Sequence, residues 1–361
     1  METMYLVLEN GRYFQGRSFG AAVDETVGEV VFTTALNGYL ETITDPSYCG
    51  QIVVQTFPMI GNYGTIPSEF ESRKPQLAGY IVREWCREPS NYRSEGDLDT
   101  FFQEKRIPAL EGVDTRALTR CLREYGTMNG MLTRKAPPYS QEELERIRSH
   151  RLRRPVRLVS SDQKEQYGPQ DALYHVVVWD FGAKQNIVRE LTERGCRVTV
   201  LGASASAGEI LAGQPDGIVL SNGPGDPEEN PEVIAELTRL YEMKIPMFGI
   251  CLGHQLMALA KGAKTEKMKY GHRGANQPVE DLNTGRIYVT SQNHGYVVRP
   301  QTLPPEARMR FVNANDGTCE GISYLDLPAF SVQFHPEACP GPLDVRWLFD
   351  EFLTQIKQYK Q

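Results

Sequence analysis

From His175 onward, short apolar runs alternate with amphipathic stretches, and this alternation restricts the fold more than any other feature of the chain. The apolar runs predict strands and the amphipathic stretches predict helices, with short connections between them. Strands are predicted at 175–179, 197–201, 217–220, 246–250, 286–289 and 330–334, and helices at 185–194, 208–211, 231–243 and 255–260. This pattern is typical of an α/β domain with a doubly wound, mostly parallel sheet, and we expect that domain to span 173–361. Such sheets place functional residues just beyond the carboxyl ends of their strands.

Residues 1–135 have a different sequence pattern, in which short predicted strands are separated by turns. These strands are expected at 5–8, 29–34, 51–57 and 77–82. A helix is expected to begin after Asp114, a suitable N-cap, and to end at Gly126. These features predict a smaller N-terminal domain of mixed α+β structure.

Residues 136–172, between the two predicted domains, are polar and contain prolines and a group of arginines. We expect a solvated linker with one exposed helix, and a docking patch for another subunit stays open as the alternative. A length of 361 residues agrees with two separate cores.

Composition and charge restrict the expected location of the protein and the classes of partner that it can bind. The formal net charge of −7 argues against a nucleic-acid or anionic-membrane partner. The chain begins without a signal-peptide pattern, and no apolar run is long enough to cross a bilayer. The seven cysteines are scattered without a Cys-x-x-Cys pair, which predicts neither a disulfide framework nor a zinc site. We therefore expect a reduced, cytoplasmic protein without a bound metal.

The most informative motif is Gly249-Ile250-Cys251-Leu252-Gly253, between a predicted buried strand and a predicted helix. It has the form of a nucleophile elbow, in which glycines permit a tight turn that leaves the nucleophile exposed. The helix N-terminus that follows favours the thiolate of Cys251, and the backbone N–H of Leu252 is expected to point into an oxyanion hole. The alternative interpretation is a buried structural cysteine beside a glycine-rich turn.

A cysteine nucleophile needs a base, and the chain has six histidines. His335 directly follows the predicted strand 330–334 and is itself followed by Pro336 and Glu337. Proline favours an extended backbone at His335, in which the side chains of His335 and Glu337 project to the same side. We therefore predict that His335 is the base and that Glu337 orients its imidazole. His294 is a rival base, but we expect no carboxylate nearby to orient it.

Two polar segments follow other predicted strands. In Ser221-Asn222-Gly223-Pro224-Gly225-Asp226-Pro227, the glycine N–H groups could complete the oxyanion hole, although such a segment is also an ordinary turn. Residues 290–296 read as a polar loop with a mobile glycine, suited to binding a polar substrate.

Together these motifs resemble the class I glutamine amidotransferases. The resemblance rests on Asn-Gly-Pro-Gly-Asp-Pro at 222–227, Gly-Ile-Cys-Leu-Gly-His-Gln at 249–255 and His-Pro-Glu at 335–337, and it covers about 173–358. It implies that Cys251 attacks the side-chain amide of glutamine and releases ammonia. Water then resolves a γ-glutamyl thioester.

Other segments are similar to the small subunits of carbamoyl-phosphate synthases, over nearly the whole chain. They are the motifs at 29–34, 44–48, 60–64, 112–116, 180–184 and 269–274. This resemblance implies that Gly223 and Leu252 supply the oxyanion donors. It also implies a set of glutamine-binding residues, namely Ser47, Gly223, Gly225, Leu252, Gln255, Asn293, Gly295 and Tyr296. From the residues alone, 45–47 is only a turn.

The chain has no Gly-x-x-x-x-Gly-Lys phosphate loop, so we expect no nucleotide or metal site on it. The family resemblance implies that ATP and a divalent metal bind to a separate large subunit. The small and the large subunit would form a heterodimer, or a higher oligomer built from such heterodimers. Ammonia would pass to that subunit along a shielded path, and the product would serve arginine or pyrimidine synthesis, or both.

Three alternatives remain at this stage. Another amidotransferase, such as the glutaminase of a guanylate or anthranilate synthase, would lack the domain at 1–135. A cysteine-dependent α/β hydrolase would have its acid between the nucleophile and the histidine, whereas Glu337 follows His335. A non-enzymatic binding scaffold would not need an intact set of Cys251, His335 and Glu337.

Overall fold

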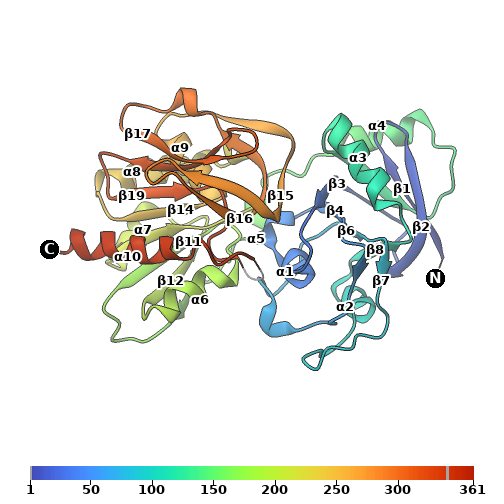
Figure 1. Cartoon of the computed structure of the whole chain (residues 1–361), viewed down its shortest axis with the longest axis horizontal. Helices are drawn as coiled ribbons and strands as arrows, with labels where there is room; N and C mark the ends of the chain where they lie inside the picture. Colours follow the sequence, from blue (N-terminus) through green and yellow to red (C-terminus); the bar gives the residue numbers. More distant parts are fainter. Residues whose placement is uncertain (1, 339–340) are drawn as a thin grey trace. The chain divides into compact units, whose positions relative to one another are not determined.

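The computed structural model describes residues 2–338 and 341–361. The chain divides into two compact units, Met1–Arg153 and Arg154–Gln361, which are described separately (Figure 1). None of the described helices is long and apolar enough to span a membrane. The described cysteines are free thiols, and Cys339 lies outside the described residues.

The first unit is built on a closed barrel. Its strands follow the order β1 (Thr3–Leu8), β2 (Tyr13–Gly20), β8 (Pro108–Glu111), β6 (Gly79–Ile81), β4 (Gln51–Gln55), β3 (Glu25–Thr33) and β9 (Met128–Thr133). The pairs β3–β4, β4–β6 and β6–β8 are parallel, and the remaining pairs are antiparallel. Buried apolar side chains such as Val31, Val53 and Tyr80 form its core.

Shorter elements complete this unit. They are α1 (Tyr39–Thr44), η1 (Pro46–Tyr48), β5 (Met59–Ile60), η2 (Pro67–Glu69), β7 (Glu84–Trp85), α2 (Leu98–Lys105), α3 (Thr115–Tyr125) and α4 (Gln141–Ser149). The predicted helix is α3, where the Asp114 carboxylate accepts from the N–H of Ala117 at 2.9 Å and Gly126 ends the helix. The four predicted strands match β1, β3, β4 and β6. The barrel closure was not predicted, because the sequences of β2, β8 and β9 do not alternate clearly between apolar and polar residues.

The segment 136–172 contributes ordered elements to both units. Helix α4 packs Leu144 and Ile147 against Val7 and Met131 of the barrel. Beyond the boundary between the units, α5 (Val156–Val159) follows, and β10 (Glu165–Tyr167) pairs antiparallel with β12 (Arg197–Gly202). Leu144, Ile147 and Val156 of this segment are buried, so the segment is more than a solvated connection, although Leu152 and Leu158 are exposed.

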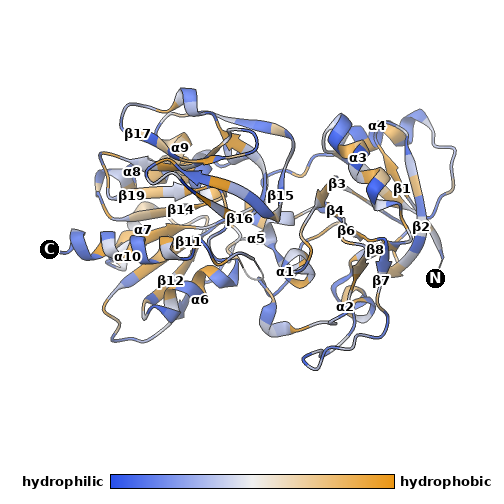
Figure 2. Ribbon diagram, viewed as in Figure 1, coloured by the Kyte–Doolittle hydropathy of each residue, from blue (hydrophilic) through white to orange (hydrophobic). Residues whose placement is uncertain are grey.

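The second unit is an α/β sheet covered on both faces. Strands β12, β11 (His175–Asp180), β13 (Gly217–Leu220), β14 (Met247–Ile250) and β19 (Ala329–Val332) run parallel. Helices α6 (Gln185–Glu193) and α10 (Trp347–Tyr359) pack on one face, and α7 (Ala207–Ala212), α8 (Pro231–Glu242) and α9 (Leu252–Ala260) pack on the other (Figure 1). Strands β11 and β14 are buried along their whole length, and Figure 2 shows hydrophobic residues concentrated on such strands. The predicted α/β class is confirmed.

An antiparallel extension continues this sheet from β19 and was not predicted. It consists of β18 (Cys319–Tyr324), β17 (Ala307–Asn313), β15 (Thr265–Asp281) and β16 (Arg286–Val298). The expectation that 290–296 is a loop is wrong, because these residues continue β16 and pair with β15 across register shifts. The polar side chains there concealed the strand, although it pairs with β15, the strand directly before it in the chain.

Candidate active site

Cys251 lies at the turn between β14 and α9, in a backbone conformation with φ 52° and ψ −103°. A positive φ is unfavourable for a residue with a side chain, so the surrounding structure must hold it. A Cβ at Gly253 would lie 2.3 Å from the backbone oxygen of Leu220, which explains the glycine after the cysteine. Helix α9 begins at Leu252, earlier than the predicted Gln255, so its N-terminus directly follows Cys251.

His335 and Glu337 follow β19, the parallel neighbour of β14. The backbone N–H of Cys251 donates to the carbonyl of Val332 at 2.8 Å, which joins the ends of the two strands. The Nδ1 atom of His335 lies 2.7 Å from Oε1 of Glu337, and both side chains are buried. The hydrogen bond expected between these residues is therefore present. The Nε2 atom of His335 is also buried and has no hydrogen-bond partner among the described residues.

Lys184 completes the surroundings of Glu337 and was missed as a site residue in the sequence. Its Nζ lies 3.5 Å from Oε1 of Glu337, and both side chains are almost fully buried. Burial alone raises the pKa of Glu337, but the attraction of His335 and Lys184 outweighs burial and lowers this pKa to about 2. Glu337 is therefore an anion near neutral pH. The sequence signal that could have identified Lys184 as a site residue was its position just after the carboxyl end of β11.

The segment 221–227 lies against the start of α9. The N–H of Gly253 donates to the carbonyl of Ser221 at 3.0 Å. A Cβ at Gly223 would lie 2.3 Å from the oxygen of Phe181 and 2.7 Å from Cδ2 of Leu252, so only glycine fits. Gly223 and Leu252, the two predicted oxyanion donors, are thus neighbours.

Strand β16 carries the predicted glutamine-binding residues Asn293, Gly295 and Tyr296, and it places Asn293 beside Cys251. The Sγ atom of Cys251 lies 3.7 Å from the carbonyl oxygen of Asn293. The side-chain amide of Gln255 donates to the carbonyl of Tyr296 at 2.8 Å and to Oε1 of Gln333 at 2.9 Å. Gln333 was also missed, because a glutamine inside an apolar run carries no signal of its own.

The other predicted binding residues lie in different places. Gly225 adopts φ +90° in the segment 221–227. Ser47 belongs to the first unit, in the turn predicted at 45–47, where its N–H donates to the carboxylate of Asp45 at 2.8 Å.

His294, the rival base, is a residue of β16, and its side chain is buried. Burial and the nearby charge of His272 lower its pKa well below the usual value. Its Nδ1 lies 2.9 Å from the carbonyl of Tyr296 and its Nε2 lies 3.1 Å from Oε1 of Gln292. The expectation that no carboxylate lies nearby is wrong, because His294, His272 and Glu320 place ligand atoms within 4.8 Å of one another. Glu320 comes from β18, which the sequence did not place beside β16.

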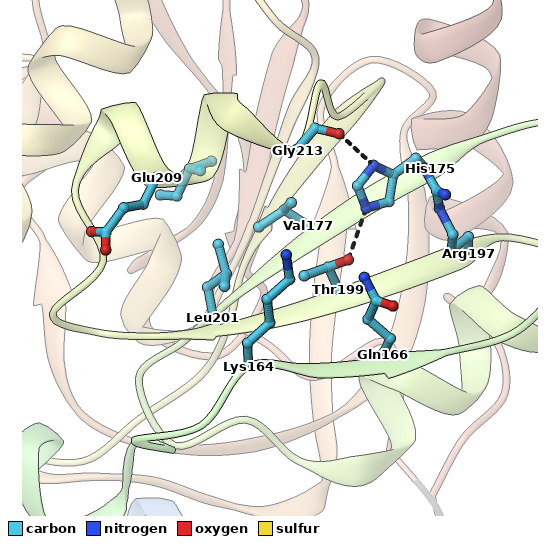
Figure 3. Close-up of a pocket in the computed structure, with 10 residues that line it drawn as sticks. Lys164, Gln166, His175, Val177, Arg197, Thr199, Leu201, Glu209 and Gly213 are labelled. Carbon is cyan, nitrogen blue, oxygen red and sulfur yellow. Dashed lines mark hydrogen bonds between the residues drawn. The ribbon is translucent and has the colours of Figure 1, made fainter. Parts of the chain in front are cut away.

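A pocket at the edge of the sheet lies away from these groups (Figure 3). His175 and Arg197 line it and are the first residues of β11 and β12, whereas Cys251 follows the last residue of β14. The pocket also reaches Leu201, near the end of β12, and neither Cys251, His335 nor Glu337 lines it. In Figure 3, His175 contacts the carbonyl of Gly213 at 3.1 Å and the hydroxyl of Thr199 at 2.8 Å. The pocket is not the candidate active site, because that site is built around Cys251, His335 and Glu337.

Two family models match the chain. The model of class-I glutamine amidotransferases matches residues 177–355, and the model of the carbamoyl-phosphate synthase small chain, CPSase domain, matches residues 6–132. The two matches fall in the second and the first unit, respectively.

Relatives match over nearly their whole length. A carbamoyl phosphate synthase small chain of Bacillus caldolyticus is 50% identical over 99% of this chain and 97% of its own. Those of Symbiobacterium thermophilum and Clostridium perfringens are 49% and 47% identical, over 97% and 96% of this chain and 97% and 98% of their own. Among solved structures, a glutamine amidotransferase of Thermotoga maritima covers 52% of this chain and 85% of its own, with 20% identity and a TM-score of 0.37. That last likeness is too weak to carry any argument.

Proposed function

This chain belongs to the family of carbamoyl phosphate synthase small chains, and from that membership we propose that it hydrolyses glutamine to supply ammonia to such a synthase. The observation that carries the proposal is the junction of β14 and β19. There, a cysteine with positive φ stands beside a strand that leads into a buried histidine–glutamate pair.

In the proposed reaction, the thiol of Cys251 loses its proton to Nε2 of His335, and the sulfur attacks the side-chain amide carbon of glutamine. The negative oxygen of the tetrahedral intermediate accepts hydrogen bonds from the backbone N–H groups of Gly223 and Leu252. His335 then gives the proton to the leaving nitrogen, which departs as ammonia and leaves a γ-glutamyl thioester. Water, deprotonated by His335, cleaves the thioester to glutamate and restores the thiol.

Glu337 is proposed to orient His335 and to stabilise its imidazolium, without taking the proton itself. Its low pKa supports this role, because an anion is available whenever His335 becomes charged. Lys184 shares Oε1 of Glu337 and is proposed to keep that carboxylate in place.

The glutamine substrate is proposed to bind along β16 and the start of α9. The family resemblance assigns this to Ser47, Gly223, Gly225, Leu252, Gln255, Asn293, Gly295 and Tyr296. The contacts of Asn293 with Cys251 and of Tyr296 with Gln255 support the second-unit part of this set. The assignment of Ser47 rests on the resemblance alone.

The ammonia is proposed to pass to a large subunit that binds ATP and a divalent metal and makes carbamoyl phosphate from bicarbonate. The product would enter arginine synthesis, pyrimidine synthesis or both, in the cytoplasm. A shielded path is required, because most ammonia in neutral water is protonated and has no free lone pair.

The test is Cys251→Ser in the complex with the large subunit. Glutamine-dependent carbamoyl phosphate synthesis should be lost, whereas synthesis from added ammonia should be retained, because the cysteine serves only to release ammonia. Loss of both activities would indicate a structural role for Cys251 and would contradict the proposal.

A further inference from the structure

A buried carboxylate stands behind the strand that faces Cys251. Glu320 of β18 has a fully buried side chain. Its Oε2 accepts a hydrogen bond from the side-chain amide of Gln292 at 3.0 Å, and its Oε1 accepts one from Asn313 at 3.3 Å. His272 Nδ1 lies 3.4 Å from Oε1, within ion-pair distance but without hydrogen-bond alignment. Both oxygens of Glu320 therefore have partners inside the protein.

Glu320 determines which way the amide of Gln292 points. The amide nitrogen of Gln292 donates to Glu320 and also, at 3.2 Å, to the hydroxyl of Thr290. That hydroxyl gives its own hydrogen to the carbonyl of Gln277 at 2.9 Å, so it must accept from Gln292. The amide oxygen of Gln292 is left to face Nε2 of His294 at 3.1 Å. Because this oxygen only accepts, Nε2 of His294 must carry a hydrogen.

The chain of contacts ends at the proposed substrate-binding strand. With its hydrogen on Nε2, a neutral His294 has no hydrogen on Nδ1 to donate to the carbonyl of Tyr296, which lies 2.9 Å away. The link from the Glu320 side chain therefore reaches this strand through Gln292, the residue before Asn293 in β16. The backbone carbonyl of Glu320 accepts from the N–H of Gln333 at 2.8 Å, and the side chain of Gln333 accepts from Gln255. Glu320 is therefore linked to both strands that flank the nucleophile, β16 and β19.

We propose that Glu320 is a positioning residue for glutamine binding, acting through Gln292 on the backbone of residues 293–296. This inference rests on the proposed function and adds a residue to it. Without an acceptor at 320, the amide of Gln292 keeps only the hydroxyl of Thr290 as an acceptor. One of its N–H hydrogens is then left unpaired in a buried site, which is costly. The strand then relaxes away from the geometry that binds glutamine, while Cys251, His335 and Glu337 keep their own contacts.

The test compares two substitutions in the complex with the large subunit. Glu320→Met keeps the approximate size of the side chain but removes the hydrogen-bond acceptor. It should raise KM for glutamine about 10-fold, which is equivalent to the loss of one buried hydrogen bond. Its kcat should stay within about 3-fold of the parent value. Glu320→Gln keeps an acceptor oxygen and should stay within about 3-fold of the parent KM. Synthesis from added ammonia should be unchanged in both variants.

Two further variants separate positioning from general loss of structure. Glu190→Met replaces another buried carboxylate, on α6, and should leave KM unchanged. Gln292→Met breaks the same relay from the other side and should raise KM as Glu320→Met does, with no further increase in the double variant. It also provides the test if Glu320→Met does not fold.

Several results would overturn the inference. They are an unchanged KM in both Glu320→Met and Gln292→Met, a fall in kcat that tracks thermal stability, or no rescue by Glu320→Gln. One equivalent of zinc in the purified protein, with activity lost on chelation, would also overturn it, since two imidazoles and a carboxylate can bind zinc. A parent complex that does not hydrolyse glutamine would instead contradict the proposed function, so the two failures are distinguishable.

Discussion

At the scale of single residues, the site combines a strained nucleophile with a buried charge pair. Cys251 keeps a positive φ because β14, α9 and the hydrogen bond to Val332 hold it from both sides. Glu337 remains ionised in a buried position because His335 and Lys184 stand within hydrogen-bond or ion-pair distance. Each group therefore depends on a partner from another part of the chain.

The first prediction concerns the relative weight of His335 and Glu337. His335→Asn should lower kcat for glutamine hydrolysis on the order of 1,000-fold or more, because His335 is the group proposed to take the thiol proton. Glu337→Gln should cost less, since it removes orientation and charge stabilisation but leaves the imidazole. Steady-state glutaminase rates of both variants measure this, and a harsher loss for Glu337→Gln would reverse the proposed roles.

The second prediction follows from the pKa of Glu337, which is lowered from 4.5 to about 2. A carboxyl whose pKa is lower in the folded protein stabilises the fold above the unfolded pKa, and this contribution is lost as pH falls towards the folded pKa. The free energy of unfolding of the parent protein should therefore decline more steeply between pH 5 and pH 2 than that of Glu337→Gln. Urea denaturation at several pH values measures the two slopes.

The control for this experiment is Glu242→Gln, at the exposed end of α8. It should follow the parent protein at every pH. Parallel curves for the parent and Glu337→Gln would contradict the buried ion pair of Glu337 with Lys184 and His335.

At the scale of elements, the start of α9 is packed so closely that its sequence has little freedom. Gly253 touches the backbone of Leu220, and the loop at 221–227 packs on the same turn. Helix α7 offers a comparison, because Gly208 has the same place in its first turn but only an ordinary contact with Ser206.

The third prediction uses these two glycines. Gly253→Ala should destabilise the protein by about 1–3 kcal/mol through overpacking and should lower glutaminase activity by displacing Leu252. Gly208→Ala should be neutral or stabilise by up to about 1 kcal/mol, since alanine favours the helix. Thermal unfolding and glutaminase rates measure both variants, and equal effects of the two would show that the elbow has room for a side chain.

At the scale of the whole molecule, the proposed chemistry lies in the second unit, and the first unit carries no group proposed for it except Ser47. We propose that residues 1–135 form much of the contact with the large subunit. The family model for carbamoyl-phosphate synthase small chains matches 6–132, which supports a role particular to this family.

The fourth prediction concerns this partner. The isolated chain should hydrolyse glutamine slowly, and the large subunit with ATP and bicarbonate should raise the rate substantially by ordering the loops of the site. Turnover of the isolated chain and of the mixture measures this, and size-exclusion chromatography shows whether a complex forms. A fully active isolated chain that never co-elutes with the large subunit would contradict both the docking role and the proposed partnership.

The sequence by itself determined the position of the elbow, the His335–Glu337 pair and the alternation of the second unit. These features are local. Consecutive residues show the hydrophobic period of a strand or a helix, and a tight turn is marked by its own glycines. The helix from Thr115 to Tyr125 was predictable for the same reason, since Asp114 and Gly126 mark its ends within the sequence.

Only the tertiary structure decided the barrel closure, the antiparallel extension and the partners of the buried polar residues. Lys184 meets Glu337, Gln255 meets Gln333 and Gln292 meets Glu320 across large distances along the chain. A buried polar side chain needs a hydrogen-bond partner, but its own segment does not reveal which distant strand supplies that partner. Strand β16 read as a loop for this reason: its polar residues are satisfied by neighbours that come together only when the sheet is complete.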